Sequence, residues 1–80
     1  MINKSNRRKT LLNVELEREI DGRWIAEIAK IPGAMAYGKT RHEAARKASA
    51  IALRTLADCL ERGNTPPVIS RLFEYAMANR

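Results

Sequence analysis

The chain has 80 residues, 45 % of them apolar, which suits one small globular domain and excludes both a multidomain protein and a disordered chain. The net charge is +6 at neutral pH, and the single cysteine excludes an internal disulfide and a cysteine-based zinc site. No apolar run approaches the roughly 20 residues of a membrane span, and the basic N-terminus lacks the apolar segment of a secretory signal, so we expect a cytoplasmic protein.

Residues 1–10 are predicted to form a basic flexible tail, and residues 11–80 a single domain. Four of the six net positive charges lie in the tail, which leaves +2 for residues 11–80. A tail of this charge can contact the phosphate backbone of nucleic acid without reading its sequence. The alternative function is therefore a nucleic-acid-associated protein, and its phosphate-contact candidates are Lys4, Arg7, Arg8 and Lys9.

Residues 11–19 alternate between apolar and polar side chains, which predicts a strand with one buried face. Residues 23–28 are the expected partner strand. The loop between them decides the register, because a three-residue loop places Leu16 opposite Ala26, whereas a two-residue loop places it opposite Glu27 and buries a carboxylate. We therefore predict a three-residue loop that ends in a glycine with left-handed backbone angles.

The stretch IPGAMAYGKTRHEA, residues 31–44, predicts a turn, a short third strand and the start of a helix. Pro32-Gly33 turns the chain after the second strand. Residues 34–37 form the predicted strand, and their small side chains would allow a helix to pack closely. Gly38 is expected to supply a backbone conformation that other residues resist.

The long helix is predicted from Arg41 to about Arg62, with an end at Gly63. At its start, Thr40 and Glu43 have the spacing of a capping box, in which the Thr40 hydroxyl accepts from the Glu43 amide and the Glu43 carboxylate accepts from the Thr40 amide. One face of the helix is rich in alanine and is expected to cover the sheet. That face consists of Ala44, Ala45, Ala48, Ile51, Ala52, Thr55, Leu56 and Cys59.

Two leucines of this helix, Leu53 and Leu60, fall on its flank, outside the width needed to cover a small sheet. They are the dimer-interface candidates, and ordinary partly exposed leucines are the equally weighted alternative. After the break NTPP, residues 68–78 fit a strand or a helix about equally well, and periodicity does not decide between them.

The succession of DGRWIAEI, IPGAMAYGKTRHEA and an alanine-rich helix resembles the HicB-like antitoxin family over residues 11–62. The resemblance implies a partial RNase H-like fold of the α+β class: a three- to four-stranded antiparallel sheet (β-β-β-α-β) with one long helix packed on one face. A further strand after the helix is common in that family, which favours a strand for residues 69–77.

The same resemblance implies a toxin–antitoxin function: a homodimer or higher homo-oligomer that neutralises a small basic, mRNA-cleaving HicA-like toxin. A binder of a basic protein needs an acidic surface, and the polar side of the first hairpin supplies one. The toxin-binding candidates on this outer face are Glu15, Glu17, Ile25 and Glu27.

Enzymatic function is not expected, nor is a metal or other cofactor. The carboxylates of the first strand fit a solvated strand face better than a metal site. The only histidine, His42, lies in the first helical turn with no nucleophile placed near it, and Cys59 lies on the apolar helix face. The glycines serve turns and form no phosphate-binding loop.

Overall fold

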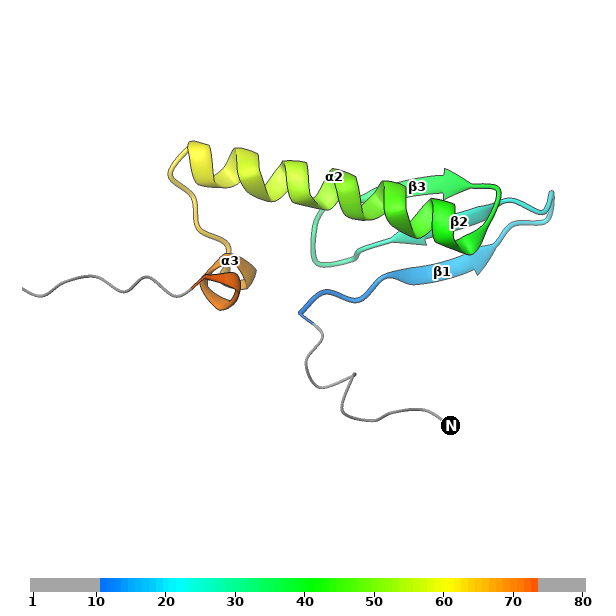
Figure 1. Ribbon diagram of the computed structural model, residues 1–80, viewed down its shortest axis with the longest axis horizontal. Coiled ribbons are helices and arrows are strands. Elements are labelled where there is room, and N and C mark those ends of the chain that lie inside the picture. Colours follow the sequence, from blue (N-terminus) through cyan, green and yellow to red (C-terminus); the bar gives the residue numbers. More distant parts are fainter. Residues whose placement is uncertain (1–10, 74–80) are drawn as a thin grey trace, which may run out of the picture.

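A computed structural model describes residues 11–73 of the chain as an antiparallel sheet with a long helix across one face and a short helix after it (Figure 1). The elements in chain order are β1 (Glu15–Arg18), β2 (Trp24–Glu27), β3 (Met35–Gly38), α2 (Arg41–Glu61) and α3 (Pro67–Leu72). The sheet has three strands in the order β1-β2-β3. The predicted α+β class with a three-stranded antiparallel sheet under one long helix is therefore confirmed.

The first hairpin has the predicted register. Leu16 lies opposite Ala26 in the antiparallel pair of β1 and β2. The three-residue loop is closed by the Glu19 N–H, which donates to the Arg23 carbonyl at 2.7 Å, and by the Gly22 N–H, which donates to the Glu19 carbonyl at 2.9 Å. Gly22 has a φ of +94°, a value that an L side chain rarely adopts, so the glycine is required here.

The loop between β2 and β3 is closed by backbone hydrogen bonds and contributes side chains to the core. The Ile28 N–H donates to the Ala34 carbonyl at 2.9 Å, and the Ile31 N–H donates to the Ile28 carbonyl at 2.9 Å. The side chains of Ile28 and Ile31 are buried as a result, at 3 % and 5 % exposure. The predicted Pro-Gly turn lies at the tip of this loop, and the third strand begins at Met35, one residue later than expected.

The start of α2 departs from the predicted capping box in one bond. The Glu43 N–H donates to the Thr40 hydroxyl at 3.0 Å as expected. The Glu43 carboxylate, however, accepts from the Lys39 N–H at 2.6 Å rather than from the Thr40 N–H. Thr40 is extended (φ −129°, ψ 163°), and the amide of the preceding residue is the one within reach of the carboxylate. This bond from the Lys39 N–H lowers the pKa of Glu43 below its ordinary value.

The end of α2 is a Schellman motif around Gly63. The Gly63 N–H donates to the Leu60 carbonyl at 3.0 Å, and the Asn64 N–H donates to the Cys59 carbonyl at 2.8 Å. Gly63 has the left-handed φ of +89° that this motif needs. The helix therefore stops where the sequence predicts, with its last residue at Glu61.

The hydrophobic core lies between α2 and the sheet. The alanine-rich face of α2 that the sequence predicted contributes one buried residue at every fourth position. The first three are alanines, and only the last is a larger residue, leucine. These residues are Ala44, Ala48, Ala52 and Leu56. Opposite them, the sheet and the β2–β3 loop bury Ala26, Ile28, Ile31 and Ala34, and α3 adds Ile69.

Gly38 is required for space and not, as the sequence suggested, for its backbone angles. Its φ is not positive. A Cβ atom at Gly38 would lie 2.5 Å from the Ala44 backbone nitrogen and 2.9 Å from the Ala44 Cα, closer than real Cβ contacts come. The first turn of α2 thus rests directly on the backbone of β3, with no side chain between them.

The strand β1 is less buried than the alternating sequence predicted. All four of its residues are exposed, and Leu16, expected in the core, is 38 % exposed. The reason is the position of α2, which lies over β2 and β3 and barely reaches β1 (Figure 1). Leu12 and Val14, just before β1, are half-buried and pack against the core.

The segment after α2 is helical where the family resemblance favoured a strand. Pro67 begins α3, and proline suits the first position of a helix because its missing N–H would have no helical partner. The Ile69 N–H donates to the Pro66 carbonyl at 2.9 Å, and the chain becomes extended again at Phe73. The strand expected from residue 69 is therefore wrong for residues 69–72, and residues 74–77 lie outside the described part of the chain.

We expect Gly38→Ala to lower the free energy of unfolding by about 1–3 kcal/mol, because the new methyl group would meet the backbone of α2, which cannot move aside as a flexible side chain can. Urea denaturation measures this. Gly63→Ala is the matched control, since nothing lies within 4 Å of its Cβ position and only left-handed strain of about 1–2 kcal/mol is added. A thermal or urea midpoint for Gly38→Ala equal to that of the wild type would contradict the close contact.

We expect the stabilising effect of Glu43 to disappear in acid. Its pKa is lowered in the folded state from 4.5, so its contribution is present above that value and is lost as the pH falls through the folded-state pKa. The urea midpoints of the wild type and of Glu43→Gln should differ at neutral pH and converge only as the pH falls through the lowered folded-state pKa of Glu43. Glu61→Gln, at the other end of α2, is the control, and a gap for Glu43→Gln that persists in acid would disprove the proposed cap.

Candidate protein-binding surface

The sheet face away from α2, which we call the outer face, is acidic on one side and apolar on the other. Because directly paired residues point to the same side of a sheet, the register places Glu17, Ile25 and Tyr37 in one row across the three strands. Glu15, Glu27 and Met35 form the next row. Tyr37 and Met35 are 42 % and 43 % exposed, so the β3 side of the outer face is apolar and open to solvent.

A depression of about 310 Å³ lies at the β1 side of this face. We call it the acidic depression, and its lining residues are Glu15, Leu16, Glu17, Glu19, Ile25 and Glu27. All four toxin-binding candidates from the sequence lie in it. The sequence did not predict Leu16 as a lining residue, because the alternation of residues 11–19 places it on the face of the strand that should be buried. It borders the depression because β1 is an edge strand that α2 leaves uncovered, so the depression reaches the free edge of the sheet.

The carboxylates of the acidic depression have no cationic partner within residues 11–73. The salt bridges there join Arg23 to Asp21, Lys47 to Glu43 and Arg62 to Asp58, and none includes a depression residue. Glu15 and Glu27 are directly opposite each other, which places two like charges in one cross-strand pair. Like charges directly opposite each other destabilise a sheet, so this pair lowers the free energy of unfolding.

Two cations close to the acidic carboxylates in sequence are held elsewhere. The guanidinium carbon of Arg18, in β1 itself, lies 5.8 Å from the centre of the Trp24 ring, and Arg23 is held after the loop. The Arg23 Nε–H donates to Asp21 Oδ2 at 2.8 Å, and the guanidinium carbon lies 4.4 Å from the centre of the Tyr37 ring. The Arg23 backbone N–H also donates to Asp21 Oδ1 at 3.0 Å, and this bond is the main cause of a lowered Asp21 pKa. Arg23 is thereby fixed over the apolar side of the outer face and does not neutralise the glutamates.

The chemistry available to the acidic depression is recognition of positive charge. No cluster of three or more His, Cys, Asp or Glu side chains suited to a metal ion occurs within residues 11–73. His42 is exposed on the first turn of α2 and Cys59 is half-buried near its end, and neither lines the depression. Clustered carboxylates around an apolar residue, Ile25, fit lysine or arginine side chains of a partner protein.

The two dimer-interface candidates are exposed on α2 as predicted. Leu53 is 62 % exposed and Leu60 is 36 % exposed. They are seven residues apart, which places them on one stripe of the helix. The sequence did not single out Leu72 and Phe73 as exposed apolar residues, yet at 44 % and 53 % exposure they add apolar surface at the end of α3.

The phosphate-contact candidates, Lys4, Arg7, Arg8 and Lys9, lie outside the described residues, as does the remainder of the predicted basic tail. No helix within residues 11–73 combines the length and apolar character that crossing a bilayer requires. No protein-family model matches the chain, and no significant match is found among curated proteins or solved structures.

If the leucine stripe joins two copies of the chain, Leu53→Glu with Leu60→Glu should convert the oligomer to a monomer, because each copy would place new carboxylates in an apolar contact. Light scattering measures the mass in solution. Arg54→Gln with Arg62→Gln lowers the net charge by the same amount at exposed positions of the same helix region and should leave the mass unchanged. An oligomer that survives the double leucine substitution rules out this stripe as the interface.

Proposed function

We propose that this chain is a HicB-like antitoxin-type module: a cytoplasmic homo-oligomer that binds a small basic, mRNA-cleaving toxin and blocks its RNA-binding surface, without catalysis or a cofactor. The observation that carries the proposal is the acidic depression, with four carboxylates and no cationic partner for them within residues 11–73, on a chain whose net charge is +6.

The charge distribution supports a basic protein as the partner. A nuclease that binds RNA needs cationic side chains at its phosphate-binding surface. Carboxylates that pair with those cationic side chains compete with the RNA phosphates for them. An acidic surface in the right place is therefore sufficient to neutralise the toxin. Carboxylates are clustered on one small face, whereas the chain as a whole is basic. This charge asymmetry orients a basic partner before contact.

The shape of the surface supports a protein rather than a free cation. Next to the carboxylates, Ile25, Met35 and Tyr37 supply apolar area of the kind that interface centres need. The free edge of β1 offers backbone N–H and C=O groups that can pair with a strand of the partner. Acidic, apolar and backbone contacts lie together on this side of the sheet, and the complex would use all three.

The experiment is a pull-down from extract of the native host, followed by an mRNA-cleavage assay of any captured small basic protein. Glu17→Gln with Glu27→Gln should lower the affinity for the toxin by about tenfold or more, since exposed interfacial charge pairs contribute about 0.5–1 kcal/mol each and these act together. Asp58→Asn with Glu61→Gln is the control with the same charge change, placed on α2.

A second measurement separates binding from folding. Because Glu27 opposes Glu15, the Glu17→Gln and Glu27→Gln variant should unfold at the same urea concentration as the wild type or a higher one. Loss of toxin binding together with loss of stability would point to a damaged fold. A chain that captures no basic protein, but shifts RNA or DNA in gels at low salt and releases it at moderate salt, would favour the alternative function of the N-terminal tail.

A further inference from the structure

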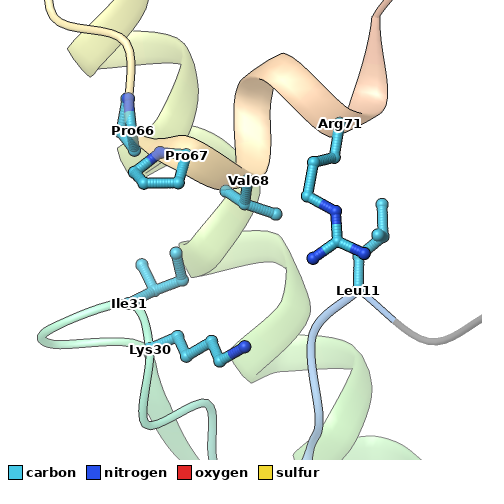
Figure 2. Close-up of a pocket in the computed structure, with 7 residues that line it drawn as sticks. All are labelled: Leu11, Lys30, Ile31, Pro66, Pro67, Val68 and Arg71. Carbon is cyan, nitrogen blue, oxygen red and sulfur yellow. The ribbon is translucent and has the colours of Figure 1, made fainter.

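A second pocket, separate from the acidic depression, lies where three distant parts of the sequence meet beside α3. Its volume is about 360 Å³. Leu11 comes from the segment before β1, and Lys30 and Ile31 come from the β2–β3 loop. Pro66 directly precedes α3, and the other three lining residues belong to α3. The lining residues are Leu11, Lys30, Ile31, Pro66, Pro67, Val68 and Arg71, and none of them lines the acidic depression (Figure 2).

The walls of this α3 pocket are apolar and its polar groups are cationic. Five of the seven lining residues are apolar, the other two are Lys30 and Arg71, and no acidic residue lines it. Figure 2 shows the Lys30 ammonium and the Arg71 guanidinium both directed into the space between Leu11 and Ile31. Neither cation takes part in a salt bridge with any residue from 11 to 73.

We propose that the α3 pocket binds a small organic carboxylate with a compact apolar body. The apolar walls favour the body of such a ligand, and the two cations favour its carboxylate, with the Arg71 guanidinium suited to bidentate contact. The volume is within the range of small-ligand sites and holds roughly a dozen water-sized groups. Inorganic phosphate or acetate would leave the apolar walls unused.

Binding at this place would also fasten α3 to the sheet. The helix α3 has six residues and contributes one buried side chain, Ile69, to the core. A helix this short has little stability without tertiary contacts. A ligand that contacts the β2–β3 loop and α3 at once binds only the docked arrangement, so it stabilises that arrangement by mass action. Occupancy of the pocket would then control the position of the exposed Leu72 and Phe73.

The test uses the full chain and hydrocinnamate, an aromatic monocarboxylate of suitable size, with amide NMR spectra as the readout. We expect progressive shifts centred on Ile31, Val68 and Arg71, and a binding constant about tenfold tighter than that of hydrocinnamyl alcohol, which has the same apolar body and no charge. Acetate, the headgroup alone, should bind at least about tenfold more weakly than hydrocinnamate.

Charge variants then assign the site. Arg71→Gln and Lys30→Gln should each weaken hydrocinnamate binding by about three- to tenfold. Arg54→Gln, which replaces an exposed cation of α2 outside the pocket, should not change it. Both pocket variants replace exposed side chains, so a thermal melt should confirm that they fold. Equal affinity for the acid and the alcohol, unchanged affinity in both variants, or no shifts at roughly 10 mM ligand would each overturn the proposal.

Discussion

The contact between the first turn of α2 and the backbone of β3 is the constraint on which the other features of this protein depend. Gly38 and Ala44 meet with no room for a methyl group between them, so the helix axis is fixed close to β3 at this end. The alanines that follow at four-residue spacing keep the helix near the sheet, and Leu56 and the isoleucines of the β2–β3 loop fill the core beyond them. Small residues thus determine where a long helix lies.

This position of α2 explains the candidate interaction surface. A helix over β2 and β3 leaves β1 uncovered, so Leu16 is exposed at the sheet edge and the glutamates around it stay in water. These carboxylates have no salt bridge within residues 11–73, and Glu15 and Glu27 are directly opposite each other, which a fold selected for stability alone would avoid. A cationic partner would remove this repulsion. The relief would contribute to the free energy of binding, in addition to the direct contacts of the complex.

The same geometry produces the α3 pocket at the opposite end of the helix. Beyond the reach of the sheet, the second half of α2 needs another element to cover its apolar face, and α3 supplies the buried Ile69 and the partly buried Val68. A six-residue helix fills this space incompletely, and the remaining volume is bordered by the β2–β3 loop and the segment before β1. One protein of 80 residues therefore presents an acidic surface and a cationic pocket that share no residue.

The sequence by itself determined the local structure: the three-residue loop, the cap at Thr40, the end of α2 at Gly63 and the identity of its buried face all follow from spacing and from residue types with strong local preferences. It also placed Glu15, Glu17, Ile25 and Glu27 on one face, because a strand alternates with period two. Only the tertiary structure decided how far α2 covers the sheet, and so whether Leu16 is buried. It also decided that residues 67–72 are helical and that Lys30 and Arg71 line one pocket, since their positions follow from packing between distant segments that no local pattern encodes.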